Sequence, residues 1–267
     1  MKELDIITEA VEKYNPTHVF GLFSGGHDSL CSCHIASQHP SFSGCVHINT
    51  GIGIEETREF VRETCKQFGW PLKEYHPPKS YEEIILENGF PGPAQHWRMY
   101  IQLKERCFRQ LKREHNPRTR KKLGFVSGVR AQESTRRMVN TGKENWSVQG
   151  REVWINPIID WSSTDKNTYI NEHNLPRNQV TENLCMSGEC LCGAFAKPGE
   201  LDEIRYWYPK AADEIDRIAE KVKEAGKHCV WGTRPPKSGA KERKTPSLPL
   251  CTSCEYKYEA SIDGFKI

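Results

Sequence analysis

The sequence predicts an α/β protein: a doubly wound parallel sheet of about five strands with helices on both faces, followed by a cysteine-rich, mainly helical and loop region. The first half of the chain repeats one unit, in which a short β-branched or aromatic run leads through a Gly/Ser turn into an amphipathic helical stretch. Parallel strands need long crossovers, and helices of this length supply them with right-handed connections. A chain of 267 residues, 36% of them hydrophobic, is long enough to bury the core of such a sheet.

The individual elements follow from hydrophobic period and turn residues. The predicted strands are His18–Ser24, Cys45–Thr50, Pro71–His76, Leu123–Val129 and Val153–Trp161. The predicted helices are Asp28–Gln38, Glu55–Phe68, Tyr81–Glu87, Trp97–His115, Ser163–His173 and one charged helix from about Glu200 to Ala225. The composition changes after the last predicted strand and helix. We therefore expect a nucleotide-binding domain over residues 1–178 and a cysteine-rich C-terminal region over residues 179–267.

Composition argues against several other classes of protein. No run of 18 apolar residues exists, and three acidic residues among the first nine occupy the place where a signal peptide needs an apolar core. We therefore expect neither a membrane partner nor secretion. Eleven cysteines are an odd number and too few for a disulfide scaffold, which favours a reducing, cytoplasmic location. The net charge of +3 does not by itself indicate a nucleic-acid partner, and an oligomer is compatible with the sequence.

The loop after the first predicted strand is the strongest functional signal. It runs Ser24-Gly25-Gly26-His27-Asp28-Ser29, between an apolar strand and a helix start. Two glycines let the backbone approach a ligand, and the amides and dipole at the helix start attract an anion. The loop matches neither the Walker A nor the dinucleotide-binding pattern. A plain glycine turn with a Ser/Asp helix cap is the alternative interpretation.

This hexapeptide resembles the SGGxDS signature of the PP-loop superfamily of adenine-nucleotide enzymes. Three later segments resemble elements of its phosphoadenosine phosphosulfate (PAPS) reductase branch. Asn49-Thr50-Gly51 with Glu55-Glu56-Thr57 resembles the D-T-G…E-T element, with Asn49 in place of Asp. Gly128 to Arg137 resembles G-x-R-x-x-E-S-x-x-R, and Asn156 to Trp161 resembles P-x-x-D-W. The resemblance implies catalytic roles for Asp28 and Arg130. It also implies nucleotide contacts by Ser24, Gly25, Gly26, Asp28, Ser29, Gly51, Gly128, Arg130, Glu133, Arg136 and Arg137.

Two chemistries fit such a pocket. PP-loop enzymes cleave ATP between its α and β phosphates with Mg²⁺ and form an adenylate, whereas the PAPS reductase branch attacks a sulfated adenine nucleotide with a thiolate. The chain has no cysteine after Cys254 and lacks the E-C-G-x-H motif of the reductases. Our leading prediction is therefore an ATP-cleaving sulfur transfer enzyme. A sulfur donor protein is one candidate partner. A nucleic-acid acceptor is the other, because the segment His228–Lys244 is basic. A PAPS or adenylylsulfate reductase and a non-catalytic nucleotide sensor are the alternatives.

Cysteines supply the second signal. The candidate metal ligands are Cys185, Cys190, Cys192, Cys251 and Cys254. Paired thiolates suit zinc or an iron–sulfur cluster. The Cys-x-Cys spacing is short for structural zinc, and iron–sulfur relatives exist in the family that the sequence resembles, so we expect a 4Fe-4S cluster. Zinc and redox-active free thiols are the alternatives.

Overall fold

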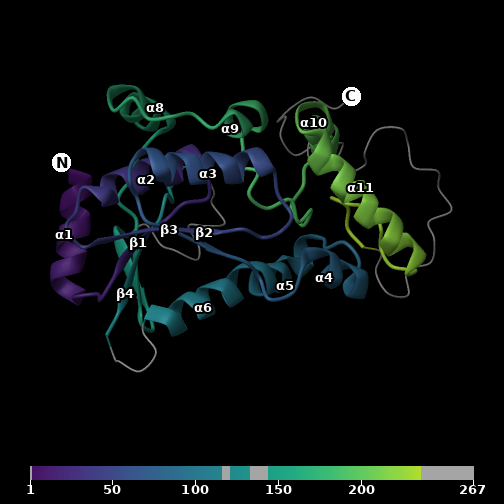
Figure 1. Cartoon of the computed structure of the whole chain (residues 1–267), viewed down its shortest axis with the longest axis horizontal. Coiled ribbons are helices and arrows are strands. Elements are labelled where there is room, and N and C mark those ends of the chain that lie inside the picture. The colour runs from purple at the N-terminus through teal and green to yellow at the C-terminus, as the bar shows by residue number, and fades with distance from the viewer. Residues whose placement is uncertain (1, 116–120, 133–143, 236–267) are drawn as a thin grey trace, which may run out of the picture. The chain divides into compact units, whose positions relative to one another are not determined.

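The structure is a computed structural model that describes residues 2–115, 121–132 and 144–235. A six-stranded sheet in the order β3-β2-β1-β4-β6-β5 forms its centre (Figure 1). The strands are β1 (Val19–Leu22), β2 (Phe42–Ile48), β3 (Leu72–Tyr75), β4 (Leu123–Val126), β5 (Trp146–Gln149) and β6 (Glu152–Ile155). All neighbours pair in parallel except β5 and β6, which are antiparallel. The predicted doubly wound α/β fold is confirmed.

Helices cover both faces of this sheet. The helices before and between the strands are α1 (Lys2–Tyr14), α2 (His27–Ser37), α3 (Glu55–Gln67), α4 (Tyr81–Asn88), α5 (His96–Tyr100) and α6 (Arg106–His115). A short 3-10 turn, Pro93–Gln95, precedes α5, and a π-helical turn, Ile101–Glu105, joins α5 to α6. After the sheet follow α8 (Ser163–Glu172), α9 (Gln179–Leu184), α10 (Glu200–Trp207) and α11 (Pro209–Glu224).

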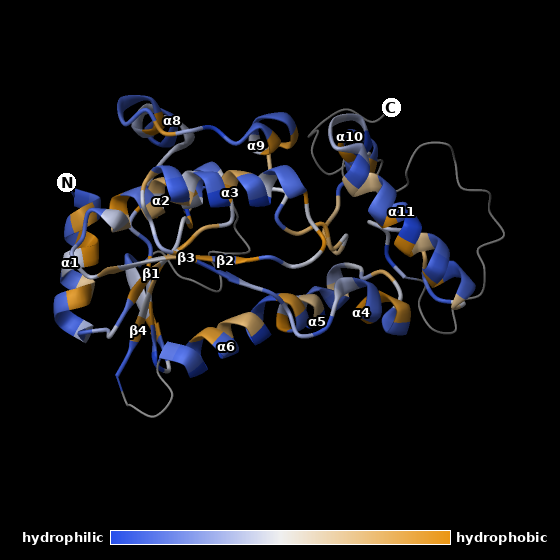
Figure 2. Cartoon of the chain, in the orientation of Figure 1, coloured by the Kyte–Doolittle hydropathy of each residue, from blue (hydrophilic) through white to orange (hydrophobic). Residues whose placement is uncertain are grey.

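Alternate strand residues pack on opposite helices, as the two-residue period of a strand requires. Leu30 of α2, Val61 of α3 and Cys45 of β2 meet in the core on one face. Phe108 of α6 and Phe125 of β4 meet on the other. Figure 2 shows the apolar stripes of these helices turned toward the sheet. Both faces are covered, so the buried strands contain few polar residues.

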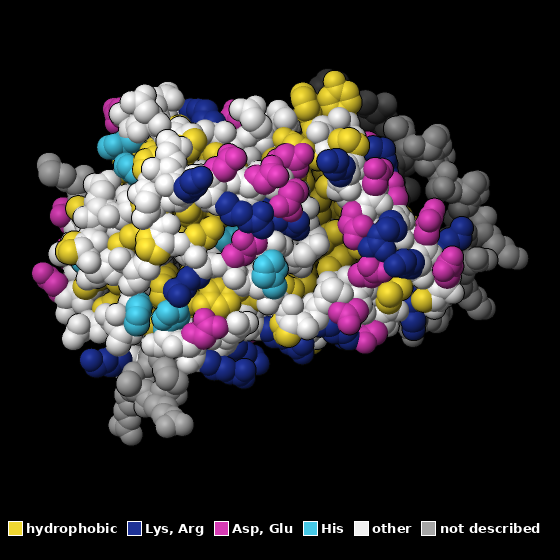
Figure 3. Space-filling model, viewed as in Figure 1, with side chains coloured by type: hydrophobic (Ala, Val, Ile, Leu, Met, Phe, Trp, Pro, Cys, Tyr) yellow, Lys and Arg dark blue, Asp and Glu magenta, His cyan; other side chains and the backbone are white. Residues whose placement is uncertain are grey.

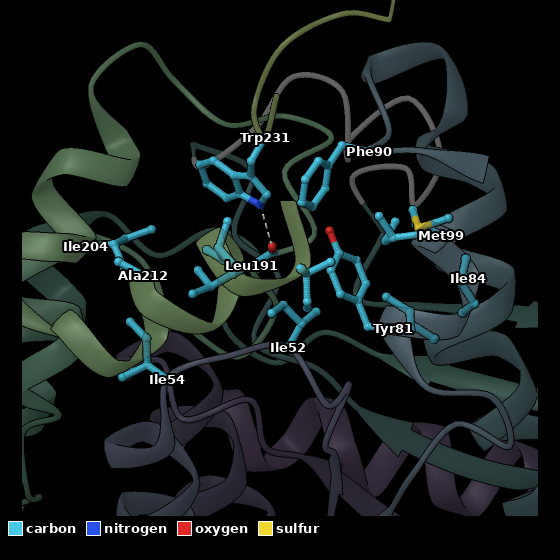
Figure 4. Close-up of a cluster of buried hydrophobic side chains, with 14 of the residues drawn as sticks. Ile52, Ile54, Tyr81, Ile84, Phe90, Met99, Leu191, Ile204, Ala212 and Trp231 are labelled. Carbon is cyan, nitrogen blue, oxygen red and sulfur yellow. Dashed lines mark hydrogen bonds between the residues drawn. The ribbon is translucent and has the colours of Figure 1, made fainter. Parts of the chain in front are cut away.

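A further core lies beyond the carboxyl edge of the sheet. It joins α4, α5, α10 and α11 to the loop after β2 and to the segment that follows α9. Figure 4 shows Trp231 over Leu191, with its indole Nε1 donating to the Leu191 carbonyl at 2.9 Å. Gly193 must remain glycine here, because its φ is 79° and an added Cβ would lie 2.7 Å from that Nε1. The cysteine-rich segment is therefore packed tightly against the rest of the unit.

The structure adds one strand that the sequence analysis missed. β5 and β6 form a hairpin through Gly150, with φ 60°, and Arg151. A two-residue turn with a glycine at positive φ is the usual connection of such a hairpin, so this local signal was present in the sequence. The predicted strand Val153–Trp161 was too long, because β6 ends at Ile155 and turns follow it.

Two helix predictions also differ from the structure. The single helix expected from Glu200 to Ala225 is divided into α10 and α11, because Tyr208 lies before Pro209 and adopts φ −137° and ψ 65°. The helix expected over Trp97–His115 includes the π-helical turn. The helices α1 and α9 were not predicted.

Residues 1–235 form one compact unit, and the predicted division at residue 178 falls inside it between α8 and α9. That division remains a prediction. None of the helices in the described ranges has the length and apolar character needed to cross a membrane.

Candidate functional site

The predicted phosphate loop lies between β1 and α2, at the carboxyl edge of the sheet. Gly25 has φ 85°, and Gly26 precedes α2 without any side-chain cap. The Ser29 hydroxyl donates to the Gly26 carbonyl at 2.7 Å and accepts from the Ser24 amide at 3.3 Å. These bonds hold the turn closed, while the absence of a cap leaves amides of the first turn of α2 available to an anion.

Arg130 and Asp28 meet at the same edge, where β1 and β4 lie side by side. Arg130 Nε donates to Asp28 Oδ1 at 2.7 Å, and its Nη1 donates to the Trp161 carbonyl at 3.4 Å. The arginine is 6% exposed. Gly128 permits this contact, because a Cβ there would lie 2.6 Å from the Ser29 amide nitrogen. The neighbouring ends of β1 and β4 are the topological switch point, where ligands bind in folds of this type.

A second layer of contacts, which the sequence analysis missed, closes over the phosphate loop. Asn178 donates from Nδ2 to the Gly25 carbonyl at 2.9 Å and from its amide to His27 Nε2 at 3.1 Å. Burial lowers the pKa of His27, so its Nε2 stays an acceptor. The Thr57 hydroxyl donates to the Ser187 carbonyl at 2.6 Å. The only local feature of the sequence that could have indicated these contacts is Asn178, a residue type that favours the N-cap position it occupies in α9.

These contacts bring the cysteine loop, residues 185–192, onto the phosphate loop. A Cβ on Gly26 would lie 3.4 Å from Ser187 Cβ, and one on Gly53 would lie 2.5 Å from the Glu189 carbonyl oxygen. The Ile54 amide donates to the Gly188 carbonyl at 2.9 Å. The segment from Asn178 to Glu189 therefore contacts the phosphate loop and the loop after β2, although more than 150 residues separate Gly25 from Asn178 in sequence.

Three cysteines of this loop differ in environment. Cys185 is exposed and ends α9 with φ 53°. Cys190 and Cys192 are half-buried and share a hydrogen bond, which lowers the pKa of Cys192 and raises that of Cys190. Lys104, on the π-helical turn, also lowers the pKa of Cys192.

Lys104 is held by Glu189, whose Oε2 lies 3.1 Å from the lysine Nζ. Burial disfavours the charge of Lys104, but the Glu189 carboxylate and Cys190 outweigh it and raise the pKa of the lysine. Through this ion pair Lys104 borders the cysteine loop. Its ammonium group is already paired.

The other predicted residues are divided between two places. Gly51 lines a hollow of about 570 Å³ between the start of α3 and the start of α11. Figure 3 shows mixed Lys/Arg and Asp/Glu side chains on both sides of this hollow. Five predicted residues lie outside the described residues: Glu133, Arg136, Arg137, Cys251 and Cys254. Within the described ranges, no three potential ligands stand close enough to hold a metal ion.

Comparison with known proteins decides the family. A family model described as the phosphoadenosine phosphosulfate reductase domain matches residues 18–190, from the start of β1 to the cysteine loop. The chain belongs to this family. The phosphoadenosine 5'-phosphosulfate reductase of Vibrio vulnificus strain CMCP6 is 24% identical over 211 residues, which are 77% of this chain and 74% of that protein. The adenosine 5'-phosphosulfate reductase of Burkholderia cepacia is 23% identical over 190 residues, 70% of this chain and 71% of that protein.

A solved structure supports the fold. The PAPS reductase of Candida auris in its phosphate complex aligns with a TM-score of 0.53 and 17% identity, covering 68% of this chain and 84% of that one. The predicted membership in the PAPS reductase-like PP-loop family is therefore confirmed, and with it an enzyme family that acts on adenine nucleotides. The iron–sulfur cluster stays a prediction.

Proposed function

We propose that this PAPS reductase family member binds a sulfated adenine nucleotide, adenylylsulfate or PAPS, and reduces its sulfate to sulfite. The observation that carries the proposal is the packing of the cysteine loop on the phosphate loop, through Asn178 on Gly25 and Ser187 on Gly26. An anion site and nucleophilic thiols in one place are what this reaction needs. The reductase alternative of the sequence analysis is thereby favoured over ATP cleavage, because the named relatives are sulfonucleotide reductases.

The chemistry proceeds in two thiol steps. A thiolate attacks the sulfur of the nucleotide, the sulfur–oxygen bond to the 5'-phosphate breaks, and the nucleotide leaves as its phosphate with the bonding pair. The protein then holds a thiosulfonate, Cys–S–SO₃⁻. A second thiolate, from a dithiol reductant, attacks the cysteine sulfur and releases sulfite, and the two thiols together lose two electrons as a disulfide. Cys185 is our candidate nucleophile, because it is the exposed thiol of the cysteine loop.

A metal group has a partial donor set here. Cys190 and Cys192 share a hydrogen bond, so this pair could supply two thiolate ligands to a 4Fe-4S cluster or to zinc. Such a group would fix the position of the thiolates that bind it. Cys251 and Cys254, the other candidate ligands of the sequence, lie outside the described residues. All nine cysteines in the described ranges are free thiols, which suits the reducing cytoplasm that we propose as the location.

The test is sulfite release from adenylylsulfate or PAPS by anaerobically purified protein with a dithiol reductant. We expect stoichiometric sulfite and AMP, or adenosine 3',5'-bisphosphate from PAPS, and loss of both products in Cys185→Ser. Iron and zinc are quantified on the same sample, since iron near four per chain identifies the cluster. Nucleotide binding without sulfite release would refute the proposal.

ATP-cleaving sulfur transfer is the second candidate function. The observation in its favour is the hexapeptide Ser24 to Ser29, which resembles the SGGxDS signature of the ATP-cleaving PP-loop enzymes. In this case Mg²⁺ and ATP occupy the phosphate loop, a sulfur donor protein charges a thiol, and a nucleic acid is the acceptor. Release of pyrophosphate from ATP, lost in Asp28→Ala, distinguishes this reaction from sulfonucleotide reduction, which consumes no ATP.

A further inference from the structure

Asn178 is a buried residue at which three distant segments of the chain meet. It is 2% exposed and forms the N-cap of α9. Its side chain contacts Gly25 of the phosphate loop and Thr57 of α3, and its backbone amide contacts His27 of α2. A buried side-chain amide needs partners for its oxygen and its nitrogen, and those partners determine which way it faces.

The partners of Asn178 fix the orientation of its side chain. Oδ1 accepts from the Val180 amide at 2.9 Å, so Nδ2 faces the phosphate loop. Nδ2 donates to the Gly25 carbonyl at 2.9 Å and to the Thr57 hydroxyl oxygen at 3.3 Å. That hydroxyl gives its own hydrogen to the Ser187 carbonyl at 2.6 Å, so its oxygen is the acceptor. Turning the amide over would set Oδ1 against the Gly25 carbonyl oxygen.

This contact determines where the next backbone amide points. The described part of the chain contains no cis peptide bond, and the C=O and N–H of a trans peptide unit point in opposite directions. Because Asn178 holds the Gly25 carbonyl, the N–H of Gly26 is directed away from Asn178. Among the described residues no acceptor receives this N–H. It is therefore a donor without a partner at the start of α2, where an anion is expected.

The phosphate loop does not fix this peptide unit by itself. The hydrogen bonds of Ser29 reach the Ser24 amide and the Gly26 carbonyl, but neither involves the Gly25 carbonyl or the Gly26 N–H. A flip of the peptide changes only ψ of Gly25 and φ of Gly26, and neither residue has a Cβ to prevent it. The flipped unit would turn a carbonyl oxygen toward the anion, which repels negative charge.

We propose that Asn178 is a positioning residue of the anion site, which fixes the Gly25–Gly26 peptide so that the Gly26 N–H binds a phosphate or sulfate oxygen of the nucleotide. The inference rests on the proposed nucleotide binding and identifies a residue outside the phosphate loop on which that binding depends. His27 supports it, because its Nε2 accepts from the Asn178 amide at 3.1 Å and joins α9 to the first turn of α2. Donors that are oriented before the ligand arrives need no reorganisation when it binds.

Two substitutions remove the contact but keep a side-chain oxygen that caps α9. Asn178→Ser is too short to reach the Gly25 carbonyl, and we expect AMP to bind about 5- to 10-fold more weakly. Asn178→Asp sets a carboxylate oxygen against that carbonyl and accepts from the Gly26 N–H after a flip, so we expect about 100-fold weaker binding. The control is Ser80→Ala, which removes the N-cap of α4 and should keep AMP affinity within about twofold. Titration calorimetry on the full, anaerobically purified chain measures these affinities.

A spectroscopic measurement separates positioning from a general structural role. In protein labelled with ¹⁵N-glycine, inorganic phosphate should shift the Gly26 amide resonance of the wild type and of Ser80→Ala, but not that of Asn178→Asp. An equal shift in Asn178→Asp, or unchanged AMP affinity in both Asn178 variants with circular dichroism showing folded protein, would overturn this inference and leave the proposed function intact. A wild-type chain that binds neither AMP nor phosphate would overturn the proposed function itself.

Discussion

Gly128→Ala tests whether the phosphate loop depends on the close approach of β4 to α2. The added Cβ would lie 2.6 Å from the Asp28 carbonyl carbon and from the Ser29 amide nitrogen, whereas ordinary contacts begin at 3.4 Å. The end of β4 must then move away from the start of α2 by about 0.8 Å, since both neighbours are backbone. A displacement of about 1 Å in a binding site can cost on the order of 100-fold in function.

We therefore expect Gly128→Ala to weaken AMP binding by about 100-fold and to lower the free energy of unfolding by about 1–3 kcal/mol. Calorimetry and urea unfolding measure the two effects. Gly124→Ala on the same strand is the control, because its nearest contact is the Val19 Cγ2 methyl at 3.2 Å, which needs a much smaller adjustment. Wild-type affinity and stability in Gly128→Ala would show that the packing of β4 on the phosphate loop is not what shapes the anion site.

Three further predictions concern charge and thiols. Asp28→Ala should lower the free energy of unfolding by about 3–5 kcal/mol, because it leaves Arg130 buried without its carboxylate partner. Adding Arg130→Met should recover much of this loss in urea unfolding. Strict additivity of the two changes would contradict the pairing. Cys185→Ser should abolish sulfite release while AMP affinity stays within about twofold, and retained turnover would exclude Cys185 as nucleophile. The hydrogen bond from Arg62 lowers the pKa of Glu74 from 4.5 to about 2, so the ionised carboxylate stabilises the fold above pH 4.5 and this contribution is lost as the pH falls toward 2. In acid unfolding, the stabilities of wild type and Glu74→Gln should therefore differ above pH 4.5 and converge between pH 4.5 and 2. A constant difference across this pH range would refute the prediction.

The fold was predictable because its signals are local. Alternating strand and helix periods gave five of the six strands and their parallel pairing, and the glycines at Gly25 and Gly26 marked the turn at the end of β1. β5 escaped because its four residues are half exposed and have no clear apolar alternation. The break at Tyr208 escaped because the helical charge pattern continues on both sides of Pro209.

The site was predictable only where its residues are contiguous. The hexapeptide of the phosphate loop contains its own hydrogen bonds, from Ser24 to Ser29, so its form follows from its sequence. The contact of Asn178 with Gly25 depends instead on how α9 packs, which no local period encodes. The same holds for Glu189, because its ion pair with Lys104 joins the cysteine loop to a π-helical turn that an ordinary helical pattern does not reveal.

The pairing of Arg130 changes how the site must balance the charge of a nucleotide. The resemblance implies that Arg130 contacts the nucleotide, and in the structure its Nε donates to Asp28, so the pair carries no net charge. Lys104 is neutralised by Glu189 in the same way. In the part of the site that the structure describes, attraction for an anion therefore rests on the amides and dipole of α2. Arg136 and Arg137 lie outside the described residues, and their contacts with the nucleotide stay predictions.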